Sequence, residues 1–138
     1  MSRVLILDCE AVQAIASATH PHHRHAVAHL QVVSHRKSKS KNVNAVVPTA
    51  VRVEAELDRT APPASFFNSL RIRDLPLDES TANRAASLRG RHHVSVPDAH
   101  LGAAIATYAA SDDITVLTSD PRDMRLVAGD VRIHIVKL

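Results

Sequence analysis

Four acidic residues, far apart in the sequence, each follow a short and mainly apolar run. They are Asp8, Glu54, Asp98 and Asp120, with Glu54 one helical turn beyond its run. Because strand ends in an open parallel sheet converge on one crevice, these carboxylates are expected to meet there. Clustered carboxylates repel one another unless a cation lies among them. Oxygen ligands of this kind favour Mg²⁺ or Mn²⁺, so the pattern predicts a site for a hard divalent cation.

The elements that must position these acids alternate in type along the chain. Strand-like segments are Val4–Leu7, Ala45–Val47, Leu70–Leu75, Ile114–Thr118 and Val131–Val136. Segments with helical spacing or helix boundary residues are 11–16, 21–33, 48–57, Ala64–Leu70, Glu79–Leu88, Asp98–Ala110 and Pro121–Val127. The polar segment Ser34–Asn44 is predicted to be a mobile loop, and Gly90 to end its helix in the left-handed conformation. The alternation favours an α/β fold with a central parallel sheet flanked by helices.

Length and composition narrow the class of protein further. The 138 residues suit one domain spanning 1–138, and 45% hydrophobic residues suffice for an aliphatic core. The single cysteine, Cys9, allows no internal disulfide, which favours a reducing compartment and hence the cytoplasm. No apolar stretch approaches the roughly 20 residues of a membrane span, and the N-terminus has no signal-peptide pattern. We therefore expect a cytoplasmic protein without a membrane partner.

Basic residues are concentrated in one part of a chain whose formal net charge is +3. No acidic residue occurs between Glu10 and Glu54, whereas six of the 10 histidines do. Such a segment suits a polyanion, and the candidate substrate contacts are Arg24, Lys37, Lys39 and Lys41. The alternative is a solvated basic loop. Because aromatics make up only 2% of the chain, sequence readout by base stacking is not expected.

Four segments around the acids resemble the PIN domain, and most closely the VapC-type toxins of bacterial toxin–antitoxin pairs. The segments are Val4–Asp8, Val47–Glu54, Val96–Ala99 and Val116–Asp123, in the family's order and with suitable spacing. The resemblance implies a metal-dependent endoribonuclease in which one or two Mg²⁺ or Mn²⁺ ions activate a water and orient the scissile phosphate. It also implies a homodimer and a small antitoxin partner whose segment blocks the acidic site.

The resemblance implies a role for each acid. Asp8 and Asp98 would ligate the metal directly, and Asp120 would do so directly or through water. Glu54 would bind a second ion or orient the attacking water, although Glu56, two residues on, is an alternative. Three further residues are auxiliary: the hydroxyl of Thr118, the outer acid Asp123, and Glu10, where the family often has Ser or Asn.

Other interpretations of these residues stay open. Asp98 and Asp120 could act only as charges at helix starts, whereas Asp8 precedes no evident cap. The His-rich run 19–25 has helix-face spacing in the pairs His22/His25 and His25/His29, but no ligand cluster at zinc-finger spacing accompanies it. We interpret it as a solvated or RNA-facing helix start, with a metal site as the alternative. His100 is predicted to lie at the surface or in an N-terminal helical turn.

Two other functions compete with the ribonuclease hypothesis. The first is a non-catalytic PIN-like module that binds RNA or a protein. The second is a phosphohydrolase or response-regulator-like protein, but that class needs a late Lys beside the acidic pocket, and Lys137 lies too near the end of the chain.

Overall fold

A computed structural model describes residues 2–40, 43–110 and 112–138. Within these residues five strands form one sheet: β1 (Ser2–Leu7), β2 (Val43–Pro48), β3 (Arg73–Leu75), β4 (Asp112–Thr118) and β5 (His134–Lys137). Their order is β3-β2-β1-β4-β5, and every neighbouring pair is parallel. The predicted parallel sheet is confirmed, and all the strands present their carboxyl ends at one edge.

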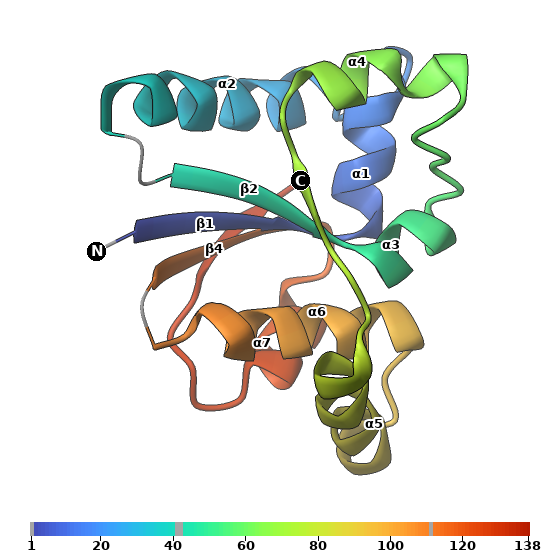
Figure 1. Cartoon of the computed structure of the whole chain (residues 1–138), viewed down its shortest axis with the longest axis vertical. Helices are drawn as coiled ribbons and strands as arrows, with labels where there is room; N and C mark the ends of the chain where they lie inside the picture. Colours follow the sequence, from blue (N-terminus) through green and yellow to red (C-terminus); the bar gives the residue numbers. More distant parts are fainter. Residues whose placement is uncertain (1, 41–42, 111) are drawn as a thin grey trace.

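Helices cover both faces of the sheet (Figure 1). On one side lie α1 (Cys9–Ala16), α2 (His23–Ser40), α3 (Thr49–Glu54), the 3₁₀ turn η1 (Pro62–Ala64) and α4 (Ser65–Ser69). On the other lie α5 (Glu79–His92), α6 (Val96–Tyr108) and α7 (Pro121–Ala128). None of the helices in the described part of the chain is both long and apolar enough to cross a lipid bilayer.

The strand side chains divide between two cores because successive residues point to opposite faces. In β1, Val4 and Ile6 pack with α5, α6 and α7, whereas Leu5 and Leu7 pack with α1 and α2. Burial on both faces explains why these strands read as continuous apolar runs in the sequence. Gly102 lets α6 approach its neighbours closely, since a Cβ there would lie 2.7 Å from a Leu88 methyl carbon and 2.8 Å from a Val127 carbon.

The prediction of a loop over 34–44 is wrong for residues 34–40, which continue α2 as helix. This stretch contains no Gly or Pro, and its Lys and Arg residues are good helix formers, so polarity alone did not end the helix. Residues 41 and 42 lie outside the described residues. Because α2 leads into the beginning of β2, its last turns lie at the amino edge of the sheet.

Two further boundaries differ from the prediction. Helix α5 continues through Gly90 to His92, and His93 is the left-handed residue at its end, with φ 56°. A glycine within a helix costs about 1 kcal/mol, which packing of the helix readily offsets. The strand expected over Leu70–Leu75 is shortened to Arg73–Leu75, because Arg71 turns the chain with φ 57°.

Candidate functional site

The predicted acids come from the carboxyl edge of the sheet. Strand β1 ends immediately before Asp8, β4 ends two residues before Asp120, and β2 leads straight into α3, whose last residue is Glu54. Parallel pairing places Leu7 opposite Leu117, so the residues that follow these strands emerge side by side. Tertiary packing, and not sequence proximity, therefore brings this edge together with the first turn of α6.

Asp8 is buried, with 7% of its surface exposed, and is held by three hydrogen bonds. One carboxylate oxygen accepts from the Ala11 amide at 2.8 Å. The other accepts from the Thr118 hydroxyl at 2.5 Å and the Ser119 amide at 3.2 Å. Burial raises the pKa of Asp8, and the three donors oppose that rise. Asp8 is the N-cap of α1, so the expectation that it does not cap a helix is wrong.

Asp98 lies half-buried in the first turn of α6, whose N-cap is Ser95. The Ser95 hydroxyl oxygen accepts from the Asp98 amide at 3.2 Å. Burial raises the pKa of Asp98 to about 6, with further contributions from the negative charges of Asp123, Glu54 and Asp8. Carboxylates from three other parts of the chain therefore act on Asp98.

Asp120 and Asp123 form a pair at the start of α7. Asp120 is the N-cap, and its carboxylate accepts from the Asp123 amide at 3.3 Å. A hydrogen bond between the two side chains raises the pKa of Asp123. The Asp120 amide donates to the Thr118 hydroxyl oxygen at 2.8 Å, and that hydroxyl donates to Asp8. Thr118 therefore connects the acid that follows β1 to the acid pair that follows β4.

Glu54 lies beside Cys9 at the exposed end of α3. Burial raises the pKa of the Cys9 thiol to about 12, and a hydrogen bond to the Glu54 carboxylate contributes to the rise. The thiol is therefore protonated at neutral pH. Glu56 lies beyond the helix, at φ 56°, and is exposed. Glu54 is the last residue of α3 and Glu56 lies beyond it, so the two side chains are not related by a rotation around one helix. The charge of Glu54 acts on Asp98.

Glu10 has a partner outside the acid cluster. Its carboxylate lies 2.8 Å from Nε2 of His20, which belongs to the turn between α1 and α2. The His20 Nδ1 atom accepts from the amide of His22 at 3.0 Å, so the imidazole is fixed at both nitrogens. The His-rich run therefore orients the carboxylate of Glu10.

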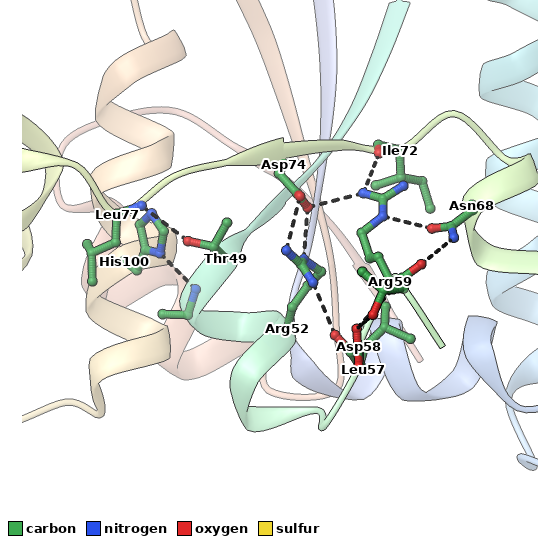
Figure 2. Close-up of polar contacts among 12 residues, drawn as sticks. Thr49, Arg52, Leu57, Asp58, Arg59, Asn68, Ile72, Asp74, Leu77 and His100 are labelled. Atoms are coloured by element: carbon green, nitrogen blue, oxygen red, sulfur yellow. Dashed lines mark hydrogen bonds and ion pairs between the residues drawn. The ribbon is translucent and has the colours of Figure 1, made fainter. Parts of the chain in front are cut away.

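A network of arginines fixes the carboxyl end of α3 (Figure 2). Arg52 binds both carboxylate oxygens of Asp74, at 2.9 and 3.1 Å, and also donates to the Leu57 carbonyl at 3.1 Å. Arg59 donates to Asp74 at 3.1 Å and to the Ile72 carbonyl at 2.8 Å. The network ties β3 to the helix that carries Glu54. Nothing in the sequence spacing indicated it, because the partners lie 15 and 22 residues apart.

His100 lies near the N-terminal end of α6, as one of the two predicted alternatives had it, but it is completely buried, so the alternative of a surface position is wrong. Its Nδ1 atom accepts from the Ala50 amide at 3.2 Å, and the neighbouring Thr49 hydroxyl oxygen accepts from the Leu77 amide at 3.1 Å (Figure 2). Burial lowers the pKa of His100, so it is neutral at pH 7. The imidazole therefore joins the beginning of α3 to α6, which carries Asp98.

A cavity of about 360 Å³ opens beside the acids, between α3 and the beginning of α6. Its lining residues are Thr49, Ala50, Val53, Glu54, Leu77, Val96 and Pro97. Val53 is 78% exposed. The walls are mainly apolar, and among the lining residues Glu54 alone carries a charge. Nothing in the sequence pattern indicates this cavity, because its walls come from three separate segments.

Three of the four basic residues proposed as substrate contacts, Arg24, Lys37 and Lys39, belong to α2. Arg24 is exposed near the beginning of α2. Lys37 and Lys39 belong to the last turns of α2, at the amino edge of the sheet, and Lys41 lies outside the described residues. Strand β2 has six residues, about 20 Å in length, so the two edges of the sheet are well separated. The backbone of Lys37 and Lys39 lies near the amino edge, and the role of both residues as substrate contacts stays a prediction.

The acids provide the ligands that a hydrated magnesium ion prefers. Among the residues that the structure describes, no three His, Cys, Asp or Glu side chains are arranged to hold one ion together. Asp8 is turned toward its three donors, and Asp120 toward Asp123. However, Mg²⁺ commonly takes only one or two protein carboxylates and keeps several waters. The all-oxygen donor set and the repulsion acting on Asp98 therefore fit Mg²⁺ or Mn²⁺ bound largely through water.

Comparisons with known proteins bear on the fold. No family model matches the chain, and no curated protein matches it. The structure is similar to that of VapBC2 from Rickettsia felis, solved bound to a DNA fragment from their promoter, with a TM-score of 0.62. The match covers 97% of this chain and 98% of that chain at 15% sequence identity. At this identity the likeness establishes the architecture, and the chain has the α/β PIN-like fold that its sequence predicted.

Proposed function

We propose that this protein is a Mg²⁺- or Mn²⁺-dependent endoribonuclease and the toxin component of a type II toxin–antitoxin module. The proposal combines the acids at the carboxyl edge of a PIN-like sheet with the sequence resemblance to VapC-type toxins. The observation that carries it is the half-buried Asp98, whose pKa is raised to about 6 by burial and by three neighbouring carboxylates. Asp98 also takes part in the start of α6, since its side chain hydrogen-bonds the N-cap Ser95, but that bond lowers the pKa and so does not account for the rise.

Each acid would have its own role at the site. Asp98 and Asp8 would hold the metal, with Asp120 and Glu54 bound directly or through its waters. When bound, the ion would supply Lewis-acid stabilisation of the phosphoryl oxygens and a more acidic water. Glu54, at the exposed rim, would orient the attacking water and accept its proton. Thr118 would hold Asp8 in place through the hydrogen bond already present.

RNA would reach the acids from the α3 and α6 side, where the cavity opens. Arg24 is an exposed cation at the beginning of α2 and would contact the phosphate backbone. Lys37 and Lys39, at the other edge of the sheet, would contact only a more distant part of a long substrate. Truncating the substrate would therefore remove their contribution before it removes cleavage.

An antitoxin and a second copy of this chain would be the protein partners. The fold likeness to VapBC2 supports the antitoxin partner, and the second copy is proposed from the sequence resemblance to VapC-type toxins alone. A basic side chain from the antitoxin would relieve the repulsion among the acids by entering the place of the cation, which would exclude the metal and the substrate.

A second candidate is a non-catalytic PIN-like module that binds RNA or protein. It is favoured by one observation: within the described residues, no three potential ligands are positioned around a common point. If that arrangement persists in the presence of metal, the chain would bind a partner without cleaving it.

Cleavage of purified RNA separates the two candidates. Wild type, Asp98→Asn and Asp113→Asn would be compared with Mg²⁺, with Mn²⁺ and with a chelator. Asp113 is the matched control, since it is exposed near the beginning of β4, away from the acids. The nuclease proposal requires discrete fragments from wild type and Asp113→Asn that depend on metal and disappear in Asp98→Asn. Equal cleavage by all three proteins would remove Asp98 from the proposed metal site, and RNA binding without cleavage would favour the second candidate.

A further inference from the structure

The exposed side of α2 carries two imidazoles whose nitrogens face each other. Nε2 of His25 and Nε2 of His29 are 3.2 Å apart, and the ring centroids are 5.0 Å apart. His25 is exposed and His29 is partly buried. The residues are four apart on a helix, the spacing that places side chains one above the other. The pair belongs to neither the acidic site nor the cavity.

The separation of the two nitrogens suits joint coordination of one metal ion. Imidazole nitrogens bind Zn²⁺ at about 2.0–2.1 Å, so two of them lie about 3.3 Å apart in a tetrahedral shell and about 2.9 Å apart at a right angle. The observed 3.2 Å falls between these values. The two rings therefore need little movement to accept a cation in place of the proton that they now share.

Other histidines of the same run are already engaged. Nε2 of His20 lies 2.8 Å from the Glu10 carboxylate, and Nδ1 of His23 lies 2.7 Å from the Ala14 carbonyl. Burial and the neighbouring His25 lower the pKa of His29, which favours the neutral ring that a metal needs. Among the described residues, no third His, Cys, Asp or Glu joins the pair, so water would complete the shell.

We propose that His25 and His29 form a surface site for a borderline divalent cation of the Zn²⁺, Ni²⁺ or Cu²⁺ class. Imidazole favours these ions, whereas the carboxylates at the sheet edge favour Mg²⁺ and Mn²⁺. The chain therefore carries two chemically distinct sites. Because coordination requires the helical spacing, the ion binds the folded form and clamps one turn of α2.

Calorimetric titration of the untagged protein with Zn²⁺ at pH 7.5 tests the site. Wild type would be compared with His25→Gln and His29→Gln. His22→Gln is the matched control, being an exposed histidine of the same run, and Asp98→Asn and Cys9→Ser control for the acidic centre and the thiol. We expect Zn²⁺ binding at the imidazole pair whose affinity is at least about tenfold weaker in each of the first two variants and changes less than twofold in the controls.

A spectroscopic measurement distinguishes coordination from a general effect of charge. The electron paramagnetic resonance spectrum of one equivalent of Cu²⁺ should show coupling to two imidazole nitrogens, and to at most one after either substitution. A loss of affinity in His22→Gln as large as in His29→Gln would overturn the proposal. So would a Cu²⁺ spectrum unchanged by His25→Gln and His29→Gln. Neither readout depends on RNA cleavage, so the result stands apart from the nuclease proposal.

Discussion

Substitution of Asp98 by Asn should stabilise the metal-free protein. The pKa of this carboxyl rises from 3.8 to about 6 on folding, which corresponds to about 3 kcal/mol of unfavourable ionisation at neutral pH. Because the group is half-exposed, solvent screening reduces this to about 1.5 kcal/mol. The substitution also removes a favourable charge at the amino end of α6, worth a few tenths of a kcal/mol. We therefore expect a net gain of about 1 kcal/mol, or about 3–5 °C in Tm.

The pH dependence fixes the sign of the effect. Below about pH 4 the carboxyl is protonated in both the folded and the unfolded chain, and above about pH 6 it is ionised in both. Between these values the unfolded chain loses the proton first, so wild type loses stability as the pH rises. The difference in unfolding free energy between Asp98→Asn and wild type should therefore grow from near zero at pH 4 to its full value at pH 7.

Metal should reverse the advantage of the variant. For a Kd on the order of 1 mM, 10 mM Mg²⁺ would stabilise wild type by about 1.4 kcal/mol and Asp98→Asn by much less. Urea unfolding followed by circular dichroism, with chelator and with Mg²⁺, measures both effects. Asp113→Asn should behave as wild type in each buffer. An Asp98→Asn protein less stable than wild type in chelator, or stabilised by Mg²⁺ to the same extent, would refute the reasoning.

Three further predictions test the elements around the site. Gly102→Ala should destabilise the fold by about 1–3 kcal/mol, because the added methyl group would clash with side chains of two helices. Gly90→Ala should instead stabilise the fold by about 0.5–1 kcal/mol, because the position faces open space. Equal urea unfolding midpoints for the two variants would contradict both predictions. Asp74→Asn should lower the unfolding free energy by about 1 kcal/mol and the rate of RNA cleavage severalfold, because it weakens the ion pair with Arg52. Unchanged values would show that the arginine network does not support the helix that carries Glu54. Because burial lowers the pKa of His100, the contribution of this residue to stability should be lost as the pH falls below about 6.5, so the unfolding free energy of His100→Asn relative to that of wild type should rise between pH 7.5 and pH 5.5 in urea titrations.

Features set by local pattern were predicted well from the sequence. The runs before Asp8 and Asp120 are buried strands, and the alternation with helices gives the parallel sheet. Such patterns are readable because hydrophobic periodicity and strand direction act over a few residues. Two predictions made from local composition were wrong. The Lys- and Ser-rich residues 34–40 are helical and not a loop, and Gly90 lies within a helix and does not end it.

The candidate site was predicted only in part. Its acids could be named from the sequence because each follows an apolar run, but their roles as metal ligands stay predictions. The capping role of Asp8 was missed, since its helix follows directly without a separate turn. The cavity beside Glu54 and the burial of His100 were not predicted either. Both depend on contacts between separate segments, and such contacts leave no periodic pattern in any one segment.

The sequence by itself determined the type of fold, the identity of the acids and the edge of the sheet where they gather. Only the tertiary structure decided that Asp98 lies within electrostatic reach of Asp123 and Glu54, and that Arg52 is held by Asp74. The physical reason is the range of the interactions. Periodicity and capping act within a few residues, whereas the repulsion among these carboxylates and the arginine pairing depend on how whole helices pack against the sheet.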